Sequence, residues 1–161
     1  MSYHELKTQE ECMQYLEKLR WGDTPKCPYC SSENARKLKK QKKYDHYYFC
    51  KDCSKYFNTL SKTIFKNSHV ELKKWFIVID IMLKSKKNFT IASVIDQVGV
   101  GRDTLGFMMH KIREAKGTDQ IILLYRIIGI EGIDGKVKAK PRKIESYPLG
   151  IDLNMYKHKT I

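Results

Sequence analysis

Apolar positions recur at helical spacing in two segments of the chain, each directly after a capping motif. The first segment follows Thr8-Gln-Glu-Glu11, which matches a capping box, and predicts a short amphipathic helix that ends near Trp21-Gly22. The second follows Ser68-His-Val-Glu71, a similar motif, and predicts a packed helix of about four turns. The apolar stripe of this second helix consists of Leu72, Trp75, Phe76, Ile79 and Leu83.

Two further helices are predicted on either side of Gly99-Val-Gly101. Thr90 can cap the first, whose core candidates are Ile91, Ala92, Val94, Ile95 and Val98. The second runs from Arg102 to Lys116, with core candidates at Leu105, Met108, Met109 and Ile112. Two short helices joined by a tight glycine turn form the helix-turn-helix pattern, which presents its second helix to the DNA major groove. Such pairs also occur as ordinary helix packing, so both interpretations stay open.

The pattern between Pro25 and Phe57 is different, because cysteine pairs, a charged run and aromatic residues replace the helical spacing. Such a segment is typical of short strands around turns. After Gly117 the pattern weakens, and residues 118–161 are expected to form a short, weakly ordered tail. The chain is thus divided into residues 1–60, 61–117 and 118–161.

Two C-x-x-C pairs dominate the strand-like segment. Cys27-Pro-Tyr-Cys30 and Cys50-Lys-Asp-Cys53 are separated by 19 residues, and each pair can bring two sulfurs to one metal ion. Four thiolates around one Zn²⁺, at about 2.3 Å each, leave no open position for water, so the predicted zinc is structural. Redox dithiols are the alternative. The predicted fold is mainly α with a small β zinc ribbon: an N-terminal helix, the four-cysteine ribbon and a helical helix-turn-helix domain.

The charge balance points to an anionic partner. Lys and Arg number 31 against 18 Asp and Glu, which gives a net charge of +13. The longest apolar stretch, from Trp75 to Leu83, contains Asp80 and falls well short of the roughly 18 residues that a membrane helix needs. Residues 1–20 do not resemble a secretory signal. We therefore expect a small basic protein of the cytoplasm that does not bind membranes.

Two groups of residues are candidates for contact with DNA. The first is the basic run over residues 36–43, which could neutralise phosphates or keep a hairpin tip soluble. The second comprises outward positions of the helix that begins at Arg102, which could reach base edges and backbone. Gly106 is also expected to face outward on this helix. The candidate contacts are Arg36, Lys37, Lys39, Lys40, Lys42, Lys43, Arg102, Asp103, Phe107, His110 and Lys111.

Aromatic residues of the ribbon and the fifth cysteine have two interpretations each. The aromatic side chains could stack on bases or pack inside the ribbon, and packing is expected for most of them. They are Tyr44, Tyr47, Tyr48, Phe49, Tyr56 and Phe57. Cys12 stands on the apolar side of the first helix, where we expect a buried thiol with no role in metal binding.

The order of these motifs resembles a known family. Leu19-Arg-Trp21 precedes the cysteine pairs, the stretch TIFKNSHVELKKWF spans residues 63–76, and His110-Lys-Ile-Arg-Glu-Ala115 closes the paired helices. Over about residues 5–117 the chain looks like the N-terminal part of zinc-ribbon insertion-sequence transposases. This resemblance implies that the ribbon and the helix-turn-helix recognise the terminal DNA of a transposon. It also implies that a ribonuclease-H-like catalytic domain with three acidic residues follows.

The chain departs from that family in two places. Ser31 and Ser54 follow the cysteine pairs, where the family usually has glycine. After residue 117 the family's Asp-Glu pair is missing, and Glu131 and Asp134 alone cannot supply the several carboxylates of two-metal chemistry. We therefore expect a DNA-binding protein without nuclease activity, whose partners are double-stranded DNA and, as further candidates, a second copy or a full-length transposase. The alternatives are a subunit of a split transposase and a ribbon that binds proteins.

Overall fold

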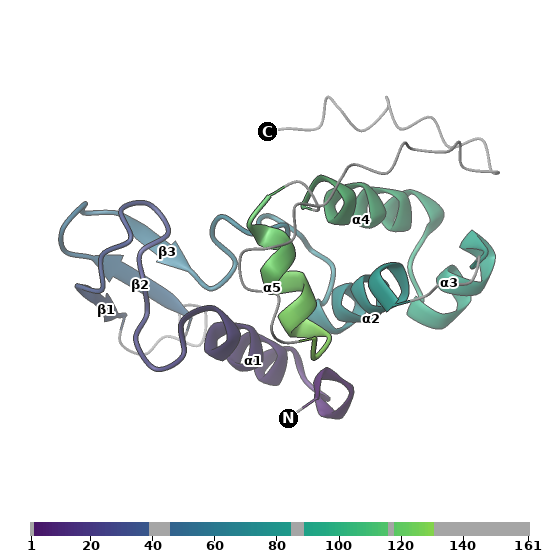
Figure 1. The fold of residues 1–161 in the computed structure, drawn as a ribbon, viewed down its shortest axis with the longest axis horizontal. Coiled ribbons are helices and arrows are strands. Elements are labelled where there is room, and N and C mark those ends of the chain that lie inside the picture. Colours follow the sequence, from purple (N-terminus) through teal and green to yellow (C-terminus); the bar gives the residue numbers. More distant parts are fainter. Residues whose placement is uncertain (1, 39–45, 85–88, 116–117, 131–161) are drawn as a thin grey trace. The chain divides into compact units, whose positions relative to one another are not determined.

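The computed structural model describes residues 2–38, 46–84, 89–115 and 118–130. These form a short 3-10 helix, five α-helices and a small three-stranded sheet, so the predicted fold class is confirmed (Figure 1). The elements are η1 (Tyr3–Glu5), α1 (Gln9–Trp21), β1 (Ala35–Lys37), β2 (Tyr47–Cys50), β3 (Tyr56–Asn58), α2 (Leu72–Lys84), α3 (Ile91–Val98), α4 (Arg102–Ala115) and α5 (Gln120–Ile127).

The chain divides into two compact units, Met1–Lys73 and Lys74–Ile161. The division lies inside α2, whereas the sequence places its first boundary at residue 60. The three-part division with boundaries at residues 60 and 117 stays a prediction.

Helix α1 begins and ends as its sequence predicts. The Thr8 hydroxyl accepts a hydrogen bond from the Glu11 backbone N–H at 3.1 Å, and the Glu11 carboxylate accepts one from the Thr8 N–H at 3.1 Å. This capping box satisfies two backbone donors that the first turn leaves free. At the other end Gly22 adopts a φ of +63°, a conformation that glycine tolerates best. Cys12 and Leu16 are fully buried on the apolar side, which confirms the prediction of a buried Cys12 thiol.

The three strands form one antiparallel sheet in the order β1-β2-β3. Side chains alternate between its two faces, and Tyr48 and Phe57 lie buried on one of them. Their rings stack with centroids 5.4 Å apart, and the indole of Trp21 meets both rings edge-on at 5.4 and 5.7 Å. The inner face of the sheet therefore packs on the end of α1 through aromatic residues.

A cluster of polar side chains also joins α1 to the sheet. His46, 9% exposed, lies between two carboxylates of α1: Nδ1 is 2.9 Å from Glu17 and Nε2 is 3.0 Å from Glu10. Glu17 also accepts hydrogen bonds from the hydroxyls of Tyr48 and Thr59. Glu10 is exposed, whereas the other groups of the cluster are buried or partly buried, each with a partner, which is the condition under which burial is tolerated.

The start of α2 differs from the prediction. The capping box at Ser68–Glu71 is wrong, because the helix begins at Leu72. The Ser68 hydroxyl instead accepts a hydrogen bond from the Val70 N–H at 3.1 Å, which forms a local turn. The Leu72 N–H is satisfied by the side chain of Gln9, at 2.9 Å, so a residue distant in the sequence caps this helix.

The second unit buries apolar residues at most of the predicted positions, while Leu83 and Ile95 are only partly buried. Val94, Leu105 and Met108 are among the residues that are at most 2% exposed, and Trp75 meets Phe107 edge-on with ring centroids 6.4 Å apart. Thr90 caps α3 as expected, through a hydrogen bond from the Ser93 N–H. No helix among the described residues is long and apolar enough to cross a membrane.

Three predictions for this unit are wrong. Two concern the burial of single residues, and one concerns the order of the segment after residue 117. Ala92, predicted to be in the core, is exposed, while Gly106, predicted to face outward, is buried. Helix α5 occupies Gln120–Ile127, within the segment that the sequence analysis assigns to a weakly ordered tail. It contacts α4 and buries Ile121, Leu124 and Ile127. Residues 131–161 of that segment lie outside the described residues.

Candidate metal centre and nucleic-acid interface

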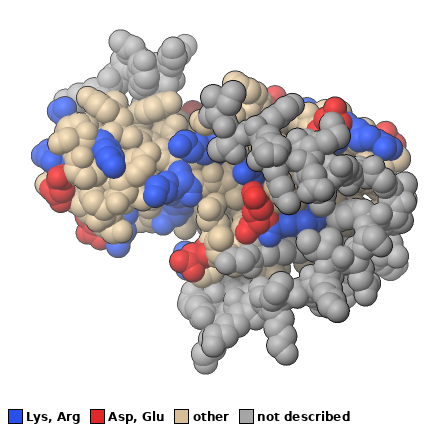
Figure 2. Space-filling view, turned by 90° about the horizontal axis from the view of Figure 1, so that it is seen from above, with Lys and Arg blue, Asp and Glu red and all other residues tan. Residues whose placement is uncertain are grey.

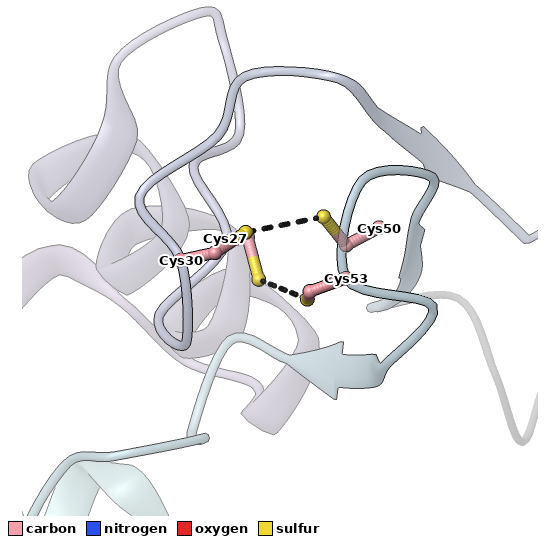
Figure 3. A group of neighbouring side chains, drawn as sticks. All are labelled: Cys27, Cys30, Cys50 and Cys53. Carbon is pink, nitrogen blue, oxygen red and sulfur yellow. Dashed lines mark hydrogen bonds between the residues drawn. The ribbon is translucent and has the colours of Figure 1, made fainter.

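Cys27, Cys30, Cys50 and Cys53 converge on one point from two loops, one before β1 and one between β2 and β3 (Figure 3). Their four sulfurs all lie within 4.8 Å of one another. The closest approaches are 3.6 Å between the sulfurs of Cys27 and Cys53 and 3.5 Å between those of Cys30 and Cys50. These distances exclude disulfides, in which the sulfurs are about 2.05 Å apart.

The spacing of the sulfurs fits a tetrahedral zinc ion. Four thiolates at about 2.3 Å from one Zn²⁺ have their sulfurs about 3.8 Å apart, close to the approaches found here. Among the described residues, these cysteines are also the only group of three or more potential ligands that could share an ion. The domain is therefore a zinc ribbon with one structural zinc, as the sequence predicts.

The loops that carry the cysteines are held by backbone hydrogen bonds. In the first loop the Ser31 N–H donates to the Cys27 carbonyl at 2.8 Å, and the Cys27 N–H donates to the Ser32 carbonyl at 2.9 Å. In the second loop the Cys50 N–H donates to the Lys55 carbonyl at 3.0 Å. The residue after each cysteine pair is left-handed: φ is +61° at Ser31 and +55° at Ser54. The loop geometry is thus the one that glycine favours, adopted here by serine.

Glycine at these two positions should strengthen the ribbon. A left-handed conformation costs an L-residue about 1–2 kcal/mol, and glycine avoids this cost but loses about 0.5–1 kcal/mol of chain entropy. For Ser31→Gly and Ser54→Gly we expect a net gain of about 0.5 kcal/mol each, seen as roughly twofold tighter zinc binding in competition with a chelator. Ser93→Gly, inside α3, is the matched control and should leave zinc affinity unchanged. Weaker zinc binding in both ribbon variants would show that the left-handed conformations of Ser31 and Ser54 are not strained.

Backbone N–H groups lower the pKa of one thiol of the centre. The backbone N–H groups of Cys53 and Asp52 point at the Cys50 sulfur and lower the pKa of this thiol to about 7. Cys27 and Cys50 are almost completely buried, whereas Cys30 is exposed. Because zinc binds thiolates, the site must lose protons when it is loaded, and zinc retention will fall as the pH is lowered.

Asp52 ties the two cysteine loops together, a role that sequence reasoning missed. Its carboxylate accepts hydrogen bonds from the Ser32 hydroxyl and from the Asn34 side chain at 2.7 Å. The hydrogen bond from Ser32, followed by that from Asn34, holds the pKa of Asp52 below its usual value. The signal available in the sequence is weak, because an Asp between two cysteines has many other uses.

The basic run predicted to contact DNA is described only at its start. Arg36 and Lys37 are exposed on β1, at the edge of the sheet. Lys39, Lys40, Lys42 and Lys43 lie outside the described residues. Figure 2 shows Lys and Arg side chains in separate groups on the one face that it draws, with acidic groups between them.

The predicted contacts on α4 are not equally accessible. Arg102 and Asp103 are exposed in its first turn, while Phe107, His110 and Lys111 are partly buried. His110 Nε2 lies 3.3 Å and Lys111 Nζ 3.1 Å from Glu114, and the Lys111 ammonium lies over the Phe107 ring at 5.9 Å. Of the predicted contacts on α4, the two residues at its N-terminus are therefore the most accessible to solvent.

Comparison with known proteins supports the ribbon. Residues 7–56 match the model of the transposase zinc-ribbon domain family. A protein described as uncharacterized, in the transposable element ISH50 of Halobacterium salinarum, is 34% identical over 64 residues. The match covers 40% of this chain and 21% of that protein, so the chain spans about a fifth of the relative's length. No solved structure matches the chain.

These matches define residues 7–56 as a transposase-type zinc ribbon and confirm the resemblance noted in the sequence for this part of the chain. The four cysteines fall inside the matched segment, and so do Arg36 and Lys37. The paired helices α3 and α4 lie beyond the segment that matches the family model.

Proposed function

We propose that the protein binds double-stranded DNA, as the recognition part of a transposase-type protein, with transposon-end sequences as its target. The observation that carries the proposal is the open N-terminus of α4, where Arg102 and Asp103 project after a short turn from α3. In a helix-turn-helix protein the N-terminal residues of the second helix are those that contact base edges. A transposase-type zinc ribbon in the same chain supports the choice of DNA as the partner.

The turn between the helices is built to hold a fixed geometry. Gly99 ends α3 in a left-handed conformation with φ +66°, and its N–H donates to the Ile95 carbonyl at 2.8 Å. The Lys74 ammonium of α2 donates to the Gly99 carbonyl at 3.0 Å. A turn fixed from both sides holds α4 at a constant angle to α3, which a helix that reads a groove requires.

The charged residues of α4 have separate roles in this proposal. Arg102 reads guanine or clamps a phosphate, and Asp103 can accept a hydrogen bond from cytosine. Lys111 contacts the DNA backbone once its ion pair with Glu114 is broken. Breaking this pair costs little free energy, because an exposed ion pair contributes only about 0–1 kcal/mol to stability. Phe107 supports the helix through Trp75 and has less freedom to contact a base than the sequence analysis assumed.

Electrostatic attraction supplies most of the affinity in this proposal. A net charge of +13 favours release of counterions from the phosphates, and Arg36 and Lys37 lie exposed on the ribbon to contribute to it. We also propose that this chain does not cut DNA by itself. Among the described residues the only multidentate metal group is the thiolate cluster, which suits structural zinc.

Binding can be tested on duplexes selected from random DNA, with affinity measured at two salt concentrations. Arg102→Ala should weaken binding at least fivefold, because a bidentate contact to a base is worth about 1–3 kcal/mol. Lys111→Ala should weaken binding to all sequences alike and reduce the slope of log affinity against log salt by about 0.9, the value for one phosphate.

Lys84→Ala is the matched control. Lys84 is an exposed lysine at the end of α2 that pairs with Asp80 at 2.6 Å, and its loss should leave DNA affinity unchanged. Equal, weak binding to all duplexes in the wild type and in Arg102→Ala would favour a protein-binding ribbon. Strand cleavage with Mg²⁺ or Mn²⁺ would contradict the proposed lack of nuclease activity and favour a split transposase.

A further inference from the structure

We propose that the outer face of the ribbon sheet binds single-stranded DNA by stacking on unpaired bases. The surface, here named the stacking face, consists of Arg36, Phe49 and Tyr56, one residue from each strand. This inference rests on the proposed function only in taking DNA as the ligand. It adds a second site, with a different form of DNA, to the duplex contact proposed for α4.

The strand register creates this face. Arg36 pairs with Phe49, and Phe49 pairs with Tyr56, so the three side chains form one row across the sheet. Directly paired residues of antiparallel strands lie on the same face. The Phe49 and Tyr56 rings have centroids 4.9 Å apart, and the Arg36 guanidinium lies over the Phe49 ring at 5.4 Å. Two rings and a guanidinium plane are therefore held together across the sheet.

Burial separates the stacking face from the aromatic core. Tyr48 and Phe57, on the inner face, are each 2% exposed and belong to the packing around Trp21. Tyr56, the first residue of β3, is 62% exposed, and Phe49 is partly exposed. The core does not need these two rings, and the exposed ring surface is available for a ligand.

The charge around the row selects a nucleic acid as the occupant. Arg36 lies within the row, Lys37 is exposed next to it on β1, and the basic run continues beyond Lys37 in the sequence. A guanidinium beside exposed aromatic rings matches the two parts of a single strand, its phosphates and its bases. Paired bases in a duplex hide their faces, so stacking on rings requires unpaired bases. A duplex would offer this face only its phosphates.

The test measures binding of the zinc-loaded full chain to a labelled 20-nucleotide oligo(dT) and to an abasic strand of equal length, by fluorescence anisotropy. The two strands share their phosphates and differ in their bases. We expect oligo(dT) to bind about tenfold more tightly than the abasic strand, since stacking contributes about 1–3 kcal/mol per base. Tyr56→Ala should remove most of this difference, and Tyr56→Phe should keep it.

Tyr29→Ala is the matched control, because Tyr29 is also an exposed tyrosine beside lysines but lies in a cysteine loop outside the row. It should leave oligo(dT) binding unchanged, and every variant should retain one zinc per chain. Equal affinity for the two strands, or unchanged oligo(dT) binding in zinc-loaded Tyr56→Ala, would overturn the inference. So would a wild-type dimer that Tyr56→Ala dissociates, or tighter binding of oligo(rU) than of oligo(dT).

The two DNA sites can be told apart by these variants. Tyr56→Ala should reduce single-strand binding while duplex binding stays within twofold of the wild type, and Arg102→Ala should do the reverse. If the duplex proposal fails, oligo(dT) binding and its loss in Tyr56→Ala remain as predicted. If only the stacking face is wrong, duplex binding persists without a preference for bases over abasic sites.

Discussion

Replacing Cys50 by serine is expected to release the zinc and unfold the ribbon. The Cys50 sulfur is fully buried next to Tyr48, Phe57 and Cys27, in a core that contains few aliphatic side chains. Binding of a structural zinc contributes on the order of 10 kcal/mol or more to the folding of such small domains. Metal analysis should find less than 0.1 zinc per chain, and the near-ultraviolet dichroism of the aromatic core should collapse. Cys27→Ser should behave in the same way.

Cys12→Ala is the control for this prediction. Cys12 is also a fully buried cysteine, but it lies on α1 outside the cluster, and burial raises the pKa of its thiol. Its replacement should keep one zinc per chain and cost only the packing of a small side chain, about 1–2 kcal/mol. A full complement of zinc in Cys50→Ser would show that the ligands have been assigned wrongly.

Removing the Glu17 carboxylate is the second change with a large expected effect. Glu17 accepts hydrogen bonds from Tyr48 and Thr59 and lies against His46, so Glu17→Ala removes this acceptor from Tyr48 and Thr59 and leaves His46 with Glu10 alone. Loss of one partner of a buried charged network costs about 3–5 kcal/mol. We expect about 3 kcal/mol in denaturant unfolding of the zinc-saturated protein. Glu10→Ala, on the exposed side of His46, should cost less than about 1 kcal/mol.

The same network predicts how stability depends on pH. The Glu17 carboxylate, and then that of Glu10, raise the pKa of His46 above its usual value. Because protonated His46 binds these carboxylates in the folded state, it stabilises the fold fully below about pH 6.5, the usual pKa of His. This stabilisation is lost as the pH rises through the higher pKa of His46 in the folded state. The free energy of unfolding should therefore fall above neutral pH in the wild type. His46→Gln should show a flatter profile over this range, and identical profiles would refute the assignment.

Local signals in the sequence predict the metal site and the first helix. Each C-x-x-C pair places two sulfurs through the conformation of one loop, and the capping box at Thr8 involves residues only three apart. The residues that decide such features are neighbours in the chain, so their spacing carries the information. Even the serines after the cysteine pairs keep the loop geometry expected of glycine.

Features that depend on distant partners could not be predicted in this way. The motif at Ser68 looks like the one at Thr8, yet α2 begins later because Gln9 satisfies its first N–H. Helical spacing places Ala92 and Gly106 correctly on helices, but which face is covered depends on the neighbouring helices. The contact between His46 and Glu17 joins residues far apart in the sequence, and no spacing rule indicates it.

The aromatic residues of the ribbon lie on both faces of the sheet. Tyr48 and Phe49 alternate between the faces of β2, so one of them must point away from α1. Alternation alone does not say which face is covered. The structure decides this through Trp21, which packs on the side of Tyr48.

Metal analysis of the purified wild-type chain is the most direct test of the account as a whole. Mass spectrometry of the intact, folded protein should show one zinc ion per chain and the loss of four thiol protons relative to the zinc-free chain, as four thiolates around one ion require. A folded protein that carries no metal, or one in which the four cysteines form disulfides, would contradict the structural zinc on which the ribbon and its proposed stacking face depend.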